Sequence, residues 1–211
     1  MRFGASILES VANITSQVVK GFAKQVVDLF NKAKPKIQRE LRTKLATAIR
    51  SQPEYGSLKS GSLRYEFGLA DISVVDSLVD RFVDSIYVTA QNINTSSTKI
   101  NAELVFSIIA NDDLDSILSS SDANIVTEKG DTLPWLNWLL LRGNEPIILT
   151  HRILIKPSPY SRTGQAIMVP TTQGSWRVPP SYIGTVENNW ITRALSSIED
   201  DINNILAKHL K

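Results

Sequence analysis

The sequence has no cysteine and only two histidines among its 211 residues. The absence of cysteine excludes a disulfide scaffold and thiolate metal sites, and it suits a reducing compartment. No run approaches the roughly 20 consecutive apolar residues that span a bilayer, so we expect no membrane partner. Apolar residues still make up 42% of the chain, enough to bury a core, and the length fits one domain over residues 1–211.

The small net charge of +2 hides an uneven distribution. Residues 1–50 hold ten Lys/Arg and three Asp/Glu, a balance of +7, whereas residues 71–128 hold two and ten, a balance of −8. Complementary patches steer association, so such a chain can attract its own copies head to tail. Two solvated faces are an equally good interpretation.

The first fifty residues carry the clearest pattern and predict an N-terminal helical arm. Apolar residues recur there in steps of three or four, which is typical of one amphipathic helix. Pro35 removes a backbone donor and should kink or split this helix near Lys34. The helix would reach about 65–70 Å at 1.5 Å per residue, so we expect part of its stripe to pack outside its own fold. The stripe consists of Ile7, Val11, Ile14, Val18, Phe22, Val26, Phe30, Ala33, Ile37, Leu41, Leu45 and Ala48.

The remaining chain predicts an α+β fold with short elements. Residues 51–68 are rich in Gly, Ser and Pro and predict a flexible loop. Residues 69–186 should form a small, mostly antiparallel sheet with short helices, and residues 187–211 a C-terminal helix with Trp190 on its apolar face. Gly143 should end a short Trp-containing helix that Asp131 or Thr132 caps.

Within 69–186, "SVVDSLVDRF" has helical spacing, with Val75, Leu78, Val79 and Phe82 on one side. "SIYVTAQNI" and "TKINAELVFSIIA" alternate and predict a hairpin joined near residues 94–97. A short helix with Asn111 as its N-cap follows, and "ANIVTE" predicts a short strand. "EPIILTHRILIKP" and "GQAIMV" predict two strands around the turn "SPYSRT".

The usual catalytic motifs are missing, so we expect no enzyme and no cofactor. His151 lies in an apolar strand, where a structural histidine is the better interpretation, and His209 suits the end of a helix. The acidic run "NDDLDS" lacks the Gly and Glu that a calcium loop needs, so we expect no metal site.

Aromatic residues predict a contact surface in "GSWRVPPSYIGTVENNWITRAL". Trp135 and Trp138 lie beside leucines and are expected in the core. Trp176 is expected in a loop held by prolines, where a rigid aromatic side chain makes a good interface anchor. A loop that folds back over its own core is an equal alternative. The predicted contact residues are Trp176, Arg177, Pro179, Pro180 and Tyr182.

Basic residues cluster along the second half of the first helix, where they could neutralise several phosphates. No aromatic residue interleaves them and no helix-turn-helix pattern accompanies them, so sequence-specific reading is not expected. The alternative function is therefore a non-enzymatic module that binds nucleic acid through residues 32–50. The strip consists of Lys32, Lys34, Lys36, Arg39, Arg42 and Lys44, followed by Arg50.

Three segments carry a resemblance to a known family. They are the long first helix followed by "AIRSQPEYGSLKSGSLRYEFGLAD", the short helix "LPWLNWLLLRGN", and the closing series "SRTGQAIMV…GSWRVPPSYIGTVENNWITRAL…INNILAKHL". Together they resemble the tail-component, or neck and tail-completion, family of long-tailed bacteriophages. The likeness spans most of residues 15–210, and the order of the elements carries more weight than any one motif.

The resemblance implies a structural virion protein that forms a ring at the head–tail junction, after assembly in the host cytoplasm. The ring would hold copies of this chain, six by preference or twelve, between connector and tail terminator or tube proteins. Its lumen would pass DNA without sequence preference. The basic strip would then face a neighbour or this channel.

Overall fold

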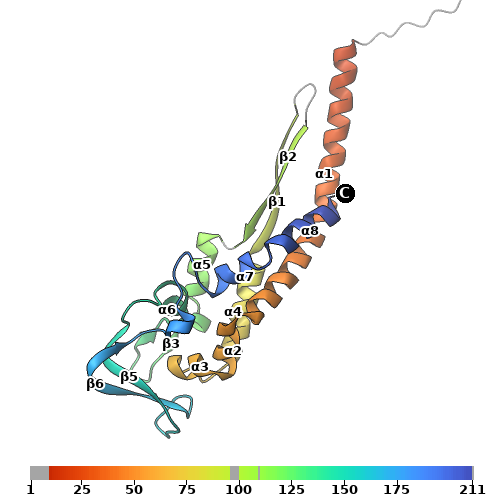
Figure 1. Ribbon diagram of the computed structural model, residues 1–211. Coiled ribbons are helices and arrows are strands. Elements are labelled where there is room, and N and C mark those ends of the chain that lie inside the picture. Colours follow the sequence, from red (N-terminus) through yellow and green to blue (C-terminus); the bar gives the residue numbers. More distant parts are fainter. Residues whose placement is uncertain (1–9, 96–99, 109, 211) are drawn as a thin grey trace, which may run out of the picture.

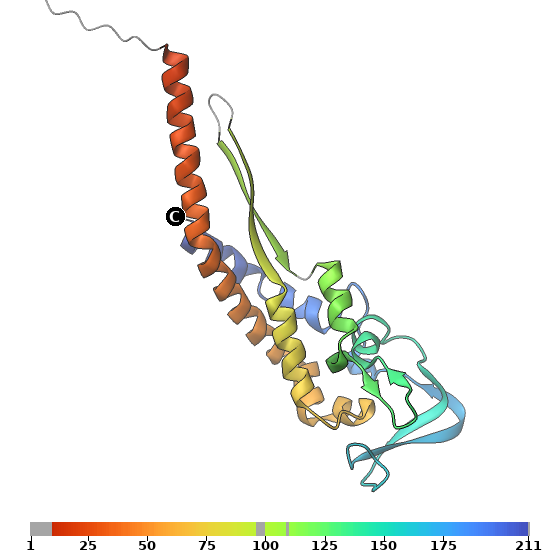
Figure 2. The same cartoon turned by 180° about the vertical axis from the view of Figure 1, so that it is seen from behind.

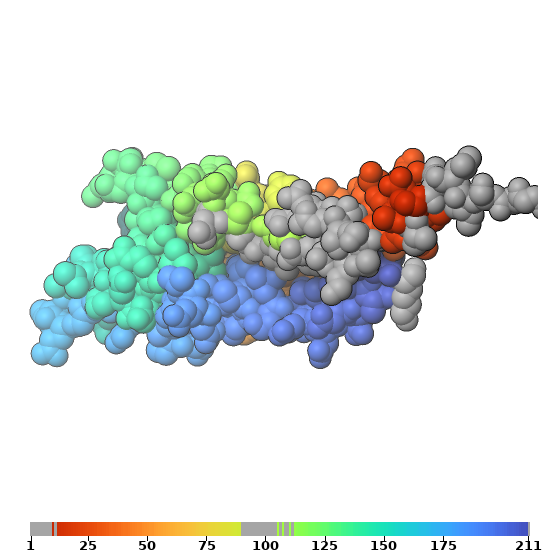
Figure 3. Space-filling view, turned by 90° about the horizontal axis from the view of Figure 1, so that it is seen from above, coloured from red at the N-terminus to blue at the C-terminus, as the bar shows by residue number. Residues whose placement is uncertain are grey.

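The computed structural model describes residues 10–95, 100–108 and 110–210. It is an elongated molecule in which a long N-terminal helix and a hairpin extend from a mixed body of short helices and strands (Figures 1 and 2). Seen from above, the first turns of the long helix lie at one end, in red, and the C-terminal helices lie along one side, in blue (Figure 3). The predicted α+β class is confirmed.

The long helix is α1, Val11–Ser51, and it begins where the Ser10 hydroxyl accepts a hydrogen bond from the amide of Asn13. Pro35 does not split it, because the helix is continuous across this residue. Proline cannot donate the helical hydrogen bond and its ring crowds the preceding turn, which bends a helix rather than ending it when packing holds both sides. Figures 1 and 2 both show the axis of α1 changing direction in its middle part.

The C-terminal half of α1 forms one wall of the core. It packs against α4 (Ser73–Asp84), whose four predicted apolar residues are all buried. That result confirms the predicted helix. Apolar residues that repeat every three to four positions lie on one side of a helix, and this side packs against the core. The buried side chains of α1 are Ala33, Ile37, Leu41, Leu45, Ala48 and Ile49.

The predicted loop at residues 51–68 is wrong, because this segment forms two helices. They are α2 (Pro53–Ser60) and α3 (Ser62–Phe67). Pro53 occupies the first helical turn, where its missing donor costs nothing, and Leu58, Leu63 and Phe67 are buried. Burial of these three side chains outweighs the weak helical preference of the Gly and Ser residues around them.

The predicted hairpin is confirmed. Strands β1 (Ile86–Thr95) and β2 (Ile100–Ile108) pair antiparallel, with Ile86 opposite Ile108 and an irregularity between Gln91 and Asn94. The hairpin runs beside the N-terminal half of α1 in both views, and the two elements are in contact (Figures 1 and 2). Of the joining residues predicted at 94–97, residues 96 and 97 lie outside the described residues.

The short elements that follow differ from prediction mainly at their ends. Helix α5 is Asn111–Leu118, with Ala110 rather than Asn111 at its N-cap position. Helix η1 (Ser121–Ala123) leads to two-residue strands β3 (Ile125–Val126) and β4 (Thr132–Leu133), which pair antiparallel. Helix α6 (Trp135–Leu141) therefore begins after Pro134, and the predicted caps Asp131 and Thr132 are wrong because Thr132 belongs to a strand.

Strands β5 (Ile148–Ile155) and β6 (Ala166–Trp176) form the third antiparallel pair, as the sequence predicts. The structure thus has three separate two-stranded ribbons in place of one small sheet, within the described residues. Helix η2 (Pro180–Tyr182) follows β6. The loop after it requires glycine at 184, since a Cβ there would lie 2.1 Å from the carbonyl oxygen of Leu139.

The predicted C-terminal helix is divided into α7 (Trp190–Ser196) and α8 (Glu199–His209). Asn189 and Thr192 form a capping box that fixes where α7 begins. Trp190 is buried as predicted, and its indole nitrogen donates to the carbonyl oxygen of Ile49 over 2.9 Å. Both helices pack on α1, and they share one core with the buried residues of its C-terminal half.

Candidate assembly surfaces

Trp176 is a core residue, and the prediction that it anchors an exposed interface is wrong. Strand β6 continues to this residue, and the side chain is only 6% exposed. Its ring meets that of Phe67 edge-on at 5.7 Å between centroids and that of Trp138 at 6.0 Å. The indole nitrogen donates to Oε2 of Glu66 over 2.5 Å. The alternative interpretation, a segment that covers its own core, fits this residue.

Glu66 accepts the hydrogen bond that the indole N–H of the buried Trp176 donates. Burial raises the pKa of the Glu66 carboxyl, while the hydrogen bond from Trp176 acts in the opposite direction. Trp138 also takes part in this aromatic cluster, but it is half-buried against the core, whereas Trp135 is fully buried as predicted. The cluster therefore joins α3, α6 and the end of β6 into one unit.

The remaining predicted contact residues alternate between surface and interior. Arg177 and Pro180 are exposed, Pro179 and Tyr182 are half-buried, and Val178 between them is fully buried. After β6 ends at Trp176, the segment thus continues as three residues without regular structure and a turn of 3₁₀ helix. An interface role for Arg177, Pro179, Pro180 and Tyr182 stays a prediction.

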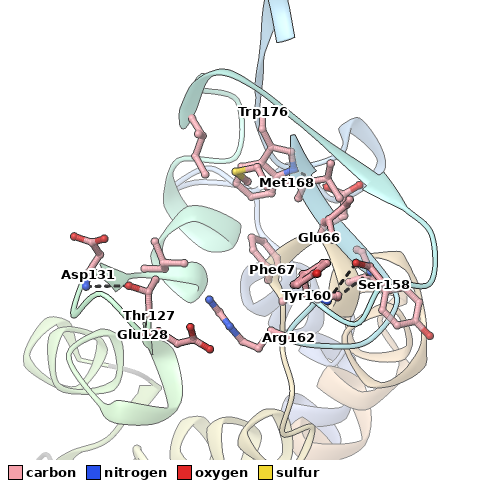
Figure 4. Close-up of a pocket in the computed structure, with 18 of the residues that line it drawn as sticks. Glu66, Phe67, Thr127, Glu128, Asp131, Ser158, Tyr160, Arg162, Met168 and Trp176 are labelled. Atoms are coloured by element: carbon pink, nitrogen blue, oxygen red, sulfur yellow. Dashed lines mark hydrogen bonds between the residues drawn. The ribbon is translucent and has the colours of Figure 1, made fainter. Parts of the chain in front are cut away.

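A cleft of about 960 Å³ opens beside this cluster (Figure 4). Its floor is aromatic, with Phe67 and Trp176 next to Glu66, and Arg162 reaches into its centre opposite Glu128 (Figure 4). The walls come from the turn between β3 and β4 and from the turn at residues 158–162. No histidine lines the cleft among the described residues.

Sequence reasoning missed this cleft because its walls come from segments that are far apart in the sequence. The feature of the sequence nearest to a signal for the cleft is Tyr160 in the predicted turn "SPYSRT", whose side chain is 95% exposed in the structure. Within the described residues, no group of three or more His, Cys, Asp or Glu side chains is placed to hold a metal ion. None of the described helices is both long and apolar enough to cross a membrane.

The predicted basic strip separates into two parts. Arg42 forms an ion pair with Asp84 at 3.2 Å, and Lys44 forms one with Asp201 at 3.0 Å. These two cations therefore serve contacts within the fold. The other four side chains have no ion-pair partner in the described part of the chain, and their predicted role toward a neighbour or a nucleic acid stays a prediction. They are Lys32, Lys34, Lys36 and Arg39.

The N-terminal half of α1 carries large apolar side chains in contact with solvent. Phe22 is 56% exposed and Val18 50%, with Ile14 and Leu29 close behind. This half of the helix stands clear of the body in both views (Figures 1 and 2). The structure confirms that the apolar stripe continues beyond its own core, and the partner that would cover it stays a prediction.

Comparisons of this chain with protein-family models, with curated proteins and with solved structures found no match.

Proposed function

We propose that this chain is a structural virion protein that forms a ring at the head–tail junction of a long-tailed bacteriophage. The observation that carries the proposal is the exposed apolar side of α1 in its N-terminal half. Contiguous exposed apolar surface marks an interaction site in proteins that otherwise bury such residues. A helix that is half core and half uncovered suits a protein whose fold is completed by assembly.

The ring is favoured by the charges of the chain and by its resemblance to the neck and tail-completion family. A closed ring uses two different patches on each subunit, one for each neighbour. The chain supplies patches of opposite sign, with unpaired lysines on α1 and unpaired aspartates on α5 in the described residues. In this ring the chain joins the connector to the tail and leaves a passage for DNA.

The test is to locate the chain in intact particles. An antibody raised against it is applied to phage particles from a lysate that contains the chain, and the particles are viewed by electron microscopy. Label confined to the point between head and tail supports the proposal. Particles that carry no label, together with purified virions that contain no peptide of the chain, contradict it.

A second candidate is a nucleic-acid-binding module, favoured by the four cations of the basic strip that have no ion-pair partner in the described chain. Its affinity would come from phosphate contacts and would fall steeply with salt. A gel-shift assay with random duplex tests it, with Lys36→Glu and Arg39→Glu as the weakened variant. A shift that is independent of salt or unchanged in the variant contradicts this candidate.

A further inference from the structure

One side of α1 changes character along its length. Its residues follow one another at spacings of three, four or seven, which places them on a single side of the helix. We call this side the outer face. Its first part is apolar and exposed, and its second part is cationic and has no ion-pair partner in the described chain. Its apolar side chains are Ile14, Val18, Phe22 and Leu29, and its cations are Lys32, Lys36 and Arg39, while Gly21, Gln25 and Asp28 lie on the same side between them.

The outer face is distinct from the side that α1 turns toward its own fold. Val19, Ala23, Val26 and Phe30 are half-buried, and their line continues into the buried residues from Ala33 onward. That second side meets β1 and β2 above and the core below. The contacts of the fold therefore leave the outer face free along both of its parts.

The surface that complements the outer face lies on the opposite edge of the same molecule. Helix α5 presents the exposed side chains of Asp112 and Asp115 on one side, and neither has an ion-pair partner in the described residues. Near the base of the hairpin, Tyr87 of β1 is 52% exposed. Helix α4 packs against both α1 and α5 and so separates them. A single copy cannot bring its outer face to its own α5.

The two edges also match in their order along the molecule. In both views the hairpin lies level with the N-terminal half of α1, and α5 lies at the base of the hairpin (Figures 1 and 2). A neighbour placed alongside in the same direction therefore meets the apolar part of the outer face with its hairpin. It meets the cationic part with the aspartates of α5.

We propose that the outer face of α1 docks against the hairpin and α5 of a second copy of this chain. Copies stand side by side in the same direction, with Lys32, Lys36 and Arg39 facing the neighbour's exposed Asp112 and Asp115. Parallel packing of one α1 on another is disfavoured, because it would place these cations against each other. The proposal rests on the ring proposed above and defines the contact between its subunits.

The absence of cysteine gives a direct test, since an introduced thiol is the sole one in the chain. Lys36→Cys and Asp112→Cys proteins are prepared separately, mixed and treated with a short bismaleimide. We expect a covalent dimer in the mixture, and a ladder of larger products from the double variant. Glu145→Cys, an exposed acid-to-thiol change just after α6, is the matched control and should give no product with Lys36→Cys.

Charge reversal gives a second, independent measurement. Lys32→Glu with Lys36→Glu is expected to lower the oligomer fraction at least tenfold, as is Asp112→Lys with Asp115→Lys, in native mass spectrometry. Mixing the two variants should restore oligomers that contain both. All four changes are at exposed side chains outside the core, and thermal melting of each variant checks that the fold is kept.

The outcomes separate this interface from the proposed function. The interface is overturned by oligomers that form while the Lys36→Cys and Asp112→Cys proteins give no joint product, or by reversed variants that do not rescue each other. Particle labelling at the neck would still support the ring in either case. A dominant product of Lys36→Cys with itself also overturns the interface. If the chain neither cross-links nor labels any particle, both proposals fail.

Discussion

The two halves of α1 use the same kinds of residue for opposite purposes. In the C-terminal half, Leu41 and Leu45 are 1% and 0% exposed, whereas Val18 and Phe22 in the N-terminal half are 50% and 56% exposed. The ionic contacts differ in the same direction, since Arg42 and Lys44 are paired within the fold and Lys32 and Lys36 are unpaired in the described chain. One half packs into the core of the molecule, and the other half keeps large apolar side chains and unpaired cations at the surface.

The largest expected difference between the halves is in core stability. Leu41→Ala should lower the free energy of unfolding by about 3 kcal/mol, because it removes buried contacts and leaves a cavity. Leu29→Ala, the same change on the exposed half, should cost less than about 0.5 kcal/mol. Urea denaturation measures both. Similar losses of stability in the two variants would contradict the difference between the two halves of α1.

The second-largest expected loss of stability comes from breaking a buried ion pair near the C-terminal half of α1. Glu54 is fully buried, and its Oε1 accepts a hydrogen bond from Arg193 of α7, while its Oε2 has no partner among the described residues. Arg193→Met would leave this carboxylate unpaired and should cost about 2–3 kcal/mol, less than a wholly buried pair because Arg193 is partly exposed. Arg142→Met, which breaks an exposed pair with Glu145, is the control and should stay within about 0.5 kcal/mol.

Acid should destabilise the contacts around the C-terminal end of α1, where Asp76 of α4 lies near Arg50. A hydrogen bond from Lys59 Nζ, and then one from Tyr55, lowers the pKa of Asp76 below its usual 3.8. A lowered folded-state pKa stabilises the fold above the unfolded value, and this contribution is lost as the pH falls through the folded value. Asp76→Asn should therefore lower Tm at pH 7 and have little effect near pH 2. An equal drop at both pH values would contradict this origin.

The contribution of Glu66 to stability should depend on pH in the opposite direction. Its folded-state pKa is raised, so its contribution is favourable below the unfolded value and is lost as the pH rises. Glu66→Gln keeps an acceptor for the indole of Trp176 and removes the buried charge, so it should raise Tm at pH 7 but not at pH 4. A melting series across this range measures the difference.

The smallest expected effect on folding belongs to the outer face of α1. Val18→Asp with Phe22→Asp should change the free energy of unfolding by less than about 0.5 kcal/mol for each site. The same variant should lose its oligomers in native mass spectrometry. Unfolding of the monomer by these changes would show that this half is part of the core after all.

Sequence periodicity predicted those elements whose burial follows from their own spacing. Helix α4 is the best example, since its four apolar positions define one face and all are buried. It failed where distant contacts decide the outcome. The Gly- and Ser-rich residues 53–67 are helical because Leu58, Leu63 and Phe67 reach a core that other segments build.

The candidate site was predicted in part for the same reason. The uncovered stripe of α1 and its free cations follow from local pattern, and the described part of the structure contains both. Trp176 was misplaced because no local signal shows that β6 extends to it or that Glu66, 110 positions earlier, accepts its hydrogen bond. The cleft escaped prediction because two turns from separate ribbons form its mouth.

A small change in the bend of α1 near Pro35 moves the N-terminal end of the helix by a larger distance. The 25 residues between Ser10 and Pro35 extend about 37 Å at 1.5 Å per residue, so a 10° difference in the bend moves the tip by about 6 Å. In a ring of such subunits, every tip would move together. In the proposed ring, the diameter of the opening at that end would then depend on this bend, while the core around Leu41 stays unchanged.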